Sequence, residues 1–356
     1  MPKVKAYIQD LYRTVLPHES RIGYLRLDRN EGVPGLSERF VKSVFAEISS
    51  GYLSCYPEYF NLQEKIAFHN NLRPENILLA NGSDAAIKYI FDAFASSGDK
   101  ILLTNPTFEM YPVYCRMFKC QNVALDYRSD FTFPLEEYLN NIVSGVKIAI
   151  IVNPNNPTGS IIKTNDLMTV IKKSEKHDVL LIVDEAYFYF CPNTVIEKVK
   201  KFSNLIILRT FSKLCGMASA RLGYIAASPE IIEGVRKVRP TYDVNGISVK
   251  LGESILDNEK IIMNLIGKFR EGKEYLINNL SEAKIEFREG HANFVLIRAP
   301  RRVDEIMNKL KDRKILISGG FRQELLKDFV RVTVGDKKIM KEFWQAFFPI
   351  WIGKND

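Results

Sequence analysis

The sequence contains no apolar run of the roughly 18 residues that a membrane-spanning helix needs. Its N-terminus, MPKVKAYIQDLYRTV, has neither the apolar core nor the small-residue cleavage site of a secretory signal. Hydrophobic residues make up 46% of the chain and charged residues 26%, the ordinary balance of a soluble globular protein. We therefore expect a cytoplasmic protein whose 356 residues form two domains, or a large and a small one.

Cysteine and histidine are scarce, and neither follows a metal-binding pattern. The five cysteines are widely spaced and include no CxxC pair, so a disulfide framework or a structural zinc site is not indicated. Small buried side chains are the simpler interpretation of these cysteines. The four histidines form no HExxH or HxH spacing. We expect no metal.

The net charge of +8 raises the alternative of a nucleic-acid partner. However, basic residues alternate with acidic ones, as in KVKAYIQD and KKSEKHD, and no zinc-finger, RNP or helix-turn-helix pattern is present. A solvated basic surface that helps to collect anionic substrates is the interpretation we favour.

Short apolar segments alternate with longer helical patterns between residues 76 and 226, for example with DAAIKYIFDAFA at 84–95 and LMTVIKKSEKH at 167–177. Several of these segments are apolar on both faces, which is typical of a sheet covered by helices on both sides. The alternation predicts an α/β domain with a mostly parallel sheet. The expected strands are 76–80, 100–104, 122–127, 147–152, 179–184, 205–210 and 222–227.

The pattern changes after about residue 245. A long helical region, roughly 248–280, precedes EFREGHANFVLIRAP, a helix near VDEIMNKLKDR, the strands in KILISGG and FVRVTVG, and a closing helix. These elements predict a smaller α+β unit that the N-terminal segment completes. We expect an N-terminal segment at 1–30 packing with the small domain or a partner subunit, a large domain at 31–245 and a small domain at 246–356.

Polar residues directly follow four of the expected strands. Ligands of open α/β sheets bind beyond the carboxyl ends of the strands. Each group alone has a simpler explanation as a helix cap, a turn or a surface lysine. Together, a phosphate-binding turn, an amide, a carboxylate and a lysine among apolar residues describe a pocket for a phosphorylated aromatic aldehyde held as a Schiff base. The residues are Gly82 and Ser83 of NGSD, Asn156 of NPNNPTG, Asp184 and Tyr187 of DEAY, Thr210, Ser212 and Lys213 of TFSK, and Arg221.

The segments NGSD, PNNPTG, VDEAY and TFSK, with RLGY beginning eight residues after Lys213, resemble those of fold-type I pyridoxal-phosphate enzymes. The branch they resemble is the histidinol-phosphate aminotransferase-like group of the class I and II aminotransferases. LDRNEGVPG, YPEYFNL, PTFEMY and FVRVTVG extend the match over nearly the whole chain. The resemblance implies the PLP-transferase fold type I, with a mostly parallel seven-stranded sheet covered by helices and a smaller α+β domain, and the cofactor pyridoxal 5′-phosphate.

The resemblance also implies catalytic roles. Lys213 would form the Schiff base and then move the proton between the substrate carbon and the cofactor as general base and acid. Asp184 would pair with the pyridinium nitrogen and keep it protonated. Tyr187 and Asn156 would hydrogen-bond the phenolate oxygen of the ring and stabilise its ionised form.

By the same resemblance, the cofactor phosphate would be held by backbone donors of one turn, by two hydroxyls and by a guanidinium. Tyr111 would lie against the face of the ring. Tyr56, of the YP motif, would reach the phosphate of the neighbouring subunit, which implies a homodimer. The phosphate-binding group is Gly82, Ser83 and Asp84 of NGSD, Thr210, Ser212 and Arg221.

On the substrate side, Arg331 of FVRVTVG matches the arginine that holds the substrate carboxylate, and Asn30 of LDRNEG matches the N-terminal active-site asparagine. Glutamate is the usual amino donor of such a site. The chain departs from the family at Ser318, where histidinol-phosphate aminotransferases carry an arginine for the substrate phosphate. Arg322 is a candidate replacement if its loop folds back. EGVPG, in place of ENPxG, also alters the pocket entrance.

Two enzyme functions follow from this pattern. The first is an aminotransferase that moves an amino group from glutamate to a small ketone or aldehyde, phosphorylated or not. The alternative is a decarboxylase of threonine phosphate or serine phosphate, whose relatives share nearly every cofactor residue. The MYPVY and RNEG segments favour the transferase. A regulator with this fold fused to a DNA-binding domain would need an additional N-terminal module, whereas the fold's own N-terminal segment is reached by residue 30.

Overall fold

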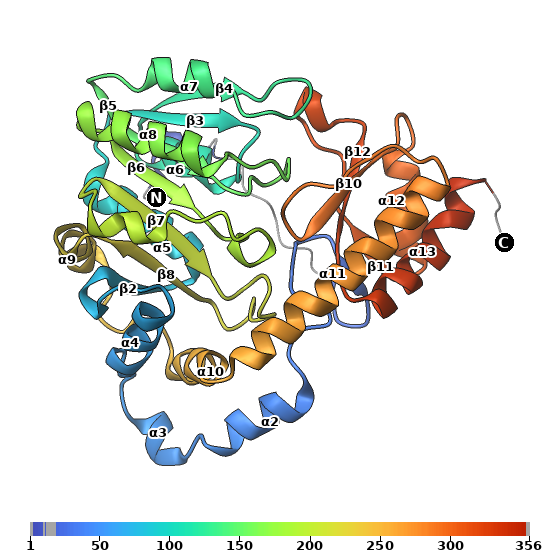
Figure 1. Ribbon diagram of the computed structural model, residues 1–356, viewed down its shortest axis with the longest axis horizontal. Coiled ribbons are helices and arrows are strands. Elements are labelled where there is room, and N and C mark those ends of the chain that lie inside the picture. The colour runs from blue at the N-terminus through green and yellow to red at the C-terminus, as the bar shows by residue number, and fades with distance from the viewer. Residues whose placement is uncertain (1–2, 10, 12–18, 354–356) are drawn as a thin grey trace.

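The computed structural model describes residues 3–9, 11 and 19–353 (Figure 1). A seven-stranded sheet forms the centre of its larger part. Neighbouring strands from β7 to β4 are parallel, whereas β8 runs antiparallel to both of its neighbours. The predicted α/β class with a mostly parallel sheet is confirmed. In spatial order the strands are β2 (Ile77–Asn81), β8 (Leu222–Ala227), β7 (Leu205–Thr210), β6 (Leu180–Asp184), β5 (Val146–Val152), β3 (Lys100–Asn105) and β4 (Gln121–Asp126).

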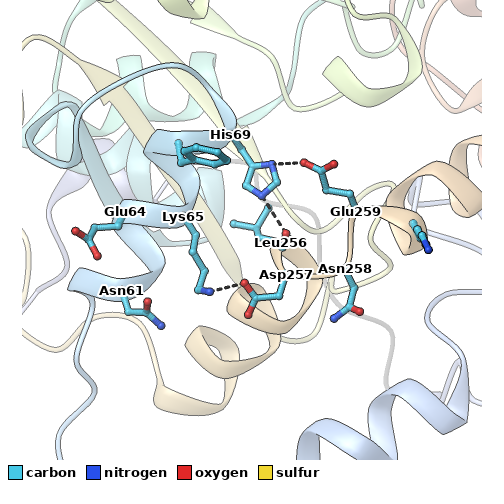
Figure 2. Close-up of a pocket in the computed structure, with 10 residues that line it drawn as sticks. Asn61, Glu64, Lys65, His69, Leu256, Asp257, Asn258 and Glu259 are labelled. Atoms are coloured by element: carbon cyan, nitrogen blue, oxygen red, sulfur yellow. Dashed lines mark hydrogen bonds and ion pairs between the residues drawn. The ribbon is translucent and has the colours of Figure 1, made fainter.

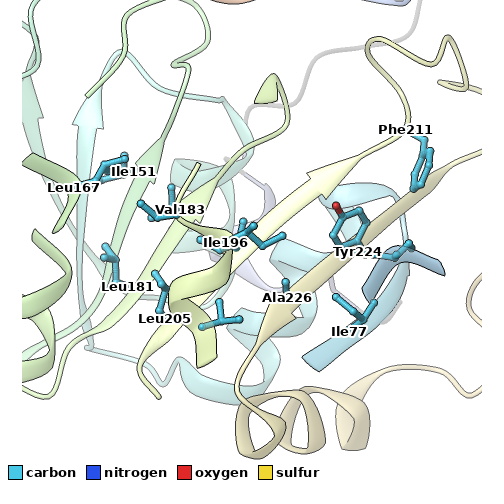
Figure 3. Close-up of a cluster of buried hydrophobic side chains, with 14 of the residues drawn as sticks. Ile77, Ile151, Leu167, Leu181, Val183, Ile196, Leu205, Phe211, Tyr224 and Ala226 are labelled. Carbon is cyan, nitrogen blue, oxygen red and sulfur yellow. The ribbon is translucent and has the colours of Figure 1, made fainter. Parts of the chain in front are cut away.

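Helices cover both faces of this sheet, and every residue of β6, β7 and β8 is therefore buried. One face packs against α5 (Gly82–Phe94), α6 (Met110–Met117) and α9 (Pro229–Val238). The other face packs against α4 (Phe60–His69), α7 (Leu135–Asn141), α8 (Thr164–Lys176) and α10 (Gly246–Leu256). Figure 3 shows this second layer, in which Ile151, Val183 and Leu205 of the strands meet Leu167 and Ile196. The central strands are thus held between two apolar layers, one on each face of the sheet.

The smaller part contains an antiparallel sheet of β9 (Phe287–Arg288), β10 (Phe294–Arg298) and β12 (Phe329–Thr333). A separate parallel pair joins β1 (Leu25–Leu27) to β11 (Ile315–Ile317). The helices α11 (Glu259–Glu282), α12 (Val303–Asp312) and α13 (Lys337–Trp351) pack on these strands. Leu27 is fully buried in this core. Residues 25–27 of the N-terminal segment therefore contribute to the smaller part.

The expected helical region at 248–280 is two helices, because α10 ends at Leu256 and α11 begins at Glu259. The intervening Asp257 and Asn258 are the flanking residues of the two helices. Val249 and Ile255 of α10 belong to the core of the larger part, and α11 continues into the smaller part (Figure 1). The domain boundaries at residues 30 and 245 stay a proposal.

The remaining helices are short. None of the helices in the described ranges has the length and apolar character to cross a bilayer. They are α1 (Ala6–Gln9), α2 (Glu38–Ala46), α3 (Ser50–Ser54) and the 3-10 turns η1 (Pro74–Asn76), η2 (Phe188–Phe190), η3 (Ile196–Lys200) and η4 (Glu324–Leu326).

Candidate active site

The carboxyl ends of β5, β6 and β7 meet at one edge of the sheet. Backbone hydrogen bonds hold these ends in register, since the N–H of Asn153 donates to the carbonyl of Asp184 at 2.8 Å and the N–H of Glu185 donates to that of Leu208 at 2.8 Å. The chain leaves β7 at Thr210 and reaches Lys213 three residues later. The polar residues expected at the strand ends therefore gather at this edge.

Lys213 lies half-buried on the loop after β7. Its ammonium is 5.6 Å from the centre of the Tyr187 ring and donates to the carbonyl of Arg29 at 3.4 Å. Gly32 packs directly against the Lys213 carbonyl, where a larger residue would collide. The charge of Lys213 also acts on Asp184 and lowers the pKa of its carboxyl group. The Lys213 ammonium and the Asp184 carboxylate are thus close enough for their charges to interact.

The Asp184 carboxylate is buried at the end of β6. It accepts hydrogen bonds from the Tyr111 hydroxyl at 2.8 Å and from the N–H of Ala186 at 3.0 Å. Burial raises the pKa of Asp184 to about 6, against the opposing effect of these bonds and of Lys213. Burial also raises the pKa of the Tyr111 phenol well above its usual value, so Tyr111 stays a donor. This side-chain contact places Tyr111 beside Asp184.

A cradle of small and cationic groups lies where β2 meets α5. Gly82, at φ +76°, begins α5 directly below the guanidinium of Arg221, which occupies the space that a Cβ atom would need. A Cβ atom at Gly223 would lie 2.6 Å from the backbone nitrogen of Ser83. The Thr210 hydroxyl donates to Ser212 Oγ at 2.9 Å, and Arg221 Nη1 donates to the same oxygen at 3.5 Å. Free N–H groups at a helix start, two hydroxyls and a guanidinium suit a phosphate.

Asp84 lies in the first turn of α5, and its carboxylate accepts from the Tyr114 hydroxyl at 3.5 Å. Its carbonyl accepts a hydrogen bond from the Tyr114 hydroxyl of α6 at 3.2 Å. That contact joins α5 to α6.

A second group of polar side chains comes from the smaller part. Arg331 on β12 donates to Asn156 Oδ1 at 2.6 Å through Nη1 and to the carbonyl of Asp28 at 2.9 Å through Nη2. Its Nε is buried and without a hydrogen-bond partner among the described residues. Asn30 donates through Nδ2 to the Tyr187 hydroxyl at 2.9 Å. A guanidinium with an unused donor is suited to a carboxylate.

The model of the family described as aminotransferase class I and II matches residues 47–347. The chain belongs to this family. This membership confirms the resemblance, the prediction of an aminotransferase and the pyridoxal-phosphate cofactor. Histidinol-phosphate aminotransferase 1 of Carboxydothermus hydrogenoformans is 33% identical over 336 residues, which cover 92% of this chain and 94% of that protein. The histidinol-phosphate aminotransferase of Clostridium novyi is 32% identical over 88% of each chain.

Solved structures of similar fold include two histidinol-phosphate aminotransferases. The Sinorhizobium meliloti enzyme, in complex with pyridoxal 5′-phosphate, is 21% identical with a TM-score of 0.87 and covers 100% of this chain and 99% of its own. The Clostridium acetobutylicum enzyme is 24% identical with a TM-score of 0.84, over 92% and 99% of the two chains. L-threonine-O-3-phosphate decarboxylase from Porphyromonas gingivalis is 21% identical with a TM-score of 0.78, over 92% and 99%. At these identities the likeness concerns the fold alone.

Two expected site residues of this aminotransferase lie away from Lys213. Tyr56 is 72% exposed and stacks on Tyr242, with ring centres 4.0 Å apart. Arg322 lines a different cavity of about 610 Å³, next to Thr107 and Glu109. Ser318, the residue after β11, pairs with Arg331 through backbone hydrogen bonds of 2.7 and 3.1 Å. The structure therefore gathers the expected cofactor residues of one chain and leaves Tyr56 on the surface.

Sequence reasoning missed several residues that this aminotransferase places in contact with the site. Gly32 had a signal, since a glycine in EGVPG indicates a close approach of two backbones. The others had none, because their contacts join distant parts of the chain. They are Arg29 against Lys213, Phe294 against the Tyr187 ring at 5.9 Å, and Thr333 and Asn293 against Asn30.

A separate surface pocket lies between α4 and the junction of α10 with α11 (Figure 2). His69 contacts the Leu256 carbonyl at 3.0 Å and the Glu259 carboxylate at 3.1 Å there, and Lys65 pairs with Asp257. Its lining shares no residue with the group around Lys213. The pocket belongs to the helix junction.

Proposed function

We propose that this aminotransferase moves an amino group from L-glutamate to a small ketone or aldehyde at the space between Lys213, Asp184 and Arg331. The observation that carries the proposal is the position of the Lys213 amine, which lies 5.6 Å from the centre of the Tyr187 ring and whose charge interacts with the buried Asp184 carboxylate. The buried, unused Nε of Arg331 supports a substrate carboxylate as the third contact. The names of the curated relatives support a phosphorylated acceptor, and the ketone corresponding to histidinol phosphate is the first acceptor to test.

The residues present fit pyridoxal phosphate. A Cβ atom at Gly82 would collide with the Arg221 guanidinium, so Arg221 can lie in the cradle only because residue 82 is a glycine. When bound, the cofactor supplies an aldehyde that carries the amino group and a ring that accepts electrons from the reacting carbon. We propose that Gly82, Ser83, Ser212 and Arg221 hold its phosphate, with support from Asp84 and Thr210.

We further propose how the other side chains act. Lys213 binds the cofactor and moves the proton at the substrate carbon as base and acid. Asp184 faces the ring nitrogen, and Tyr111, bonded to Asp184, keeps that carboxylate in place next to the ring. Tyr187 and Asn156 donate to the ring oxygen. Arg331 binds the substrate carboxylate. Arg322 stays the candidate for a substrate phosphate. Its cavity is also lined by Glu109, which is close enough to Arg331 for the two charges to interact, so the cavity lies near the proposed carboxylate site.

The half-reaction with glutamate alone tests the function. Adding glutamate to the cofactor-loaded protein should convert the cofactor to its amine form and release 2-oxoglutarate, measured by absorbance and by a coupled assay for the keto acid. A panel of ketones and aldehydes, with and without phosphate, then identifies the acceptor. Release of CO₂ from threonine phosphate or serine phosphate, without any half-reaction, would instead establish the decarboxylase.

We propose a homodimer in which Tyr56 enters the site of the partner subunit. Support comes from the exposed aromatic and aliphatic side chains at residues 52–68 and from the exposed Tyr242, which stacks on Tyr56. A hybrid experiment tests the arrangement: Lys213→Ala and Tyr56→Ala subunits, each inactive alone, should on equal mixing regain about a quarter of the parent activity, because half of the dimers contain one intact site. No recovery would place Tyr56 outside the partner's site. The exposed residues are Tyr52, Leu53, Phe60, Phe68 and Tyr242.

We also propose a cytoplasmic location. The five cysteines are all free in the structure, and free thiols persist in a reducing compartment.

A further inference from the structure

Asn30 occupies an uncommon backbone conformation inside the site. It is 1% exposed and has φ of +55°, in the left-handed region that few residues other than glycine adopt readily. Each of its four polar groups has a partner. Its N–H donates to Thr333 Oγ1 at 3.0 Å, its carbonyl accepts from Asn293 Nδ2 at 3.1 Å, its Oδ1 accepts from the Thr333 hydroxyl at 3.4 Å, and its Nδ2 donates to the Tyr187 hydroxyl at 2.9 Å.

The Thr333 hydroxyl decides which way the Asn30 amide points. Thr333 is fully buried, so its single hydroxyl hydrogen needs a protein acceptor. In the observed orientation that acceptor is Asn30 Oδ1. An amide turned by 180° would present its NH₂ group to Thr333 and leave the Thr333 hydrogen without an acceptor. The cost of a buried, unpaired hydroxyl favours the observed orientation.

The orientation of Asn30 determines what Tyr187 can donate. Because Asn30 Nδ2 donates to the Tyr187 oxygen, the hydroxyl hydrogen of Tyr187 stays available for another acceptor. In the turned orientation, Asn30 Oδ1 would accept that hydrogen. Two hydrogen bonds therefore run in one direction, from Thr333 through Asn30 to Tyr187.

We propose that Thr333 is a positioning residue that directs the Tyr187 hydroxyl hydrogen to the phenolate oxygen of the pyridoxal ring by fixing the side chain of Asn30. The proposal deepens the proposed function and rests on the role given there to Tyr187. Arg331 and Thr333 are two residues apart on β12 and so share a face of the strand. The strand that binds the substrate carboxylate thus also orients a hydrogen bond to the cofactor.

The visible absorbance of the cofactor-loaded protein, measured against pH, tests this proposal. A hydrogen bond to the ionised ring oxygen lowers the pH at which the spectrum of the bound cofactor changes. Thr333→Val keeps the shape and removes the hydroxyl, so this midpoint should rise by about one pH unit. Thr333→Ser restores the hydroxyl and should keep the parent midpoint. Thr169→Val, on the exposed face of α8, is the matched control and should change nothing.

Asn30→Asp supplies a second test that does not depend on a valine in the core. Both side-chain oxygens are then acceptors, so one of them takes the Tyr187 hydrogen, and the midpoint should again rise. The dissociation constant of the cofactor, from equilibrium dialysis, should increase in Thr333→Val and in Asn30→Asp but not in Thr333→Ser. An unchanged midpoint in Thr333→Val would overturn the role of Thr333, and an unchanged midpoint in Asn30→Asp as well would overturn the role of Asn30.

Tyr187→Phe separates this proposal from the proposed function. That variant should raise the midpoint by itself, and adding Thr333→Val to it should have no further effect, because both changes remove the same hydrogen bond. If Tyr187→Phe leaves the midpoint unchanged, the role of Tyr187 in the proposed function is wrong. If Tyr187→Phe raises the midpoint but Thr333→Val does not, only the role of Thr333 is wrong.

Discussion

Replacing the charge of Asp184 should stabilise the cofactor-free protein while removing its ability to use the cofactor. The Asp184 carboxyl is buried, and its pKa is raised from 3.8 to about 6. A folded-state pKa above the unfolded value means that the folded protein binds this proton more tightly, so the contribution of Asp184 to stability falls as pH rises from 4 to 6. Above pH 6 the folded protein carries the full cost of the buried charge.

The size of this cost follows from the shift. The difference of about two pKa units corresponds to about 3 kcal/mol at pH 8, and about half of that at pH 5, where the folded carboxyl is largely protonated. Asp184→Asn is nearly isosteric, and its one side-chain oxygen can still accept from Tyr111, but the bond from the Ala186 N–H is lost at a cost of about 1 kcal/mol. We therefore expect the variant to be more stable than the parent by about 2 kcal/mol at pH 8 and by less than about 1 kcal/mol at pH 5.

Urea unfolding of the cofactor-free proteins at the two pH values measures this difference. Asp312→Asn, which alters an exposed carboxylate at the end of α12, is the control and should change stability by less than about 0.5 kcal/mol. The loaded Asp184→Asn protein should have almost no activity, since an amide cannot hold the ring nitrogen protonated. A variant that is less stable than the parent at pH 8, or equally stabilised at both pH values, would refute the account of Asp184 as a costly buried charge.

Two further substitutions test the cradle and the carboxylate site. Gly223→Ala places a Cβ atom 2.6 Å from the Ser83 nitrogen and 2.8 Å from the Gly82 carbonyl carbon. Displacing this backbone should cost about 1–3 kcal/mol, so the cofactor dissociation constant, measured by fluorescence titration, should rise roughly 5- to 150-fold. Gly234→Ala, whose Cβ atom would meet only Phe94 at 3.7 Å, should leave it unchanged, and equal effects would contradict the packing argument. Arg331→Lys loses the planar donor fork, and the KM for glutamate should rise about 10- to 100-fold in steady-state assays while Arg298→Lys has no effect. A parent-like KM in Arg331→Lys would remove that residue from its proposed role.

Much of the fold and of the cofactor side of the site could be predicted because the relevant signals are local. Each strand of the large sheet is a short apolar run, and in a parallel sheet the ends of such runs meet at one edge. Asp184, Thr210 and Lys213 could therefore be grouped without knowing any contact between them. The cradle was also accessible, since Gly82 and Ser83 are adjacent at a strand-to-helix turn.

The division of the helical region after residue 245 shows where a local signal was present and was passed over. The apolar pattern continues through α10 and α11, which favours a single helix. Asp257 and Asn258, however, are residue types that commonly flank helix ends. Treating these two residues as a helix boundary would have predicted two helices in place of one.

The contacts that orient the site were beyond sequence reasoning for a different reason. Thr333 and Asn30 are 303 residues apart, and Asn30 and Tyr187 are 157 apart, so no periodicity or motif connects them. Arg331 could be matched to a role through its motif, but its bond to Asn156 joins two separate sheets. The local sequence thus specifies which chemical groups reach the edge of the large sheet. The hydrogen bonds that orient Tyr187 and Asn156 at that edge depend instead on how β12 and the Asn30 segment pack against it.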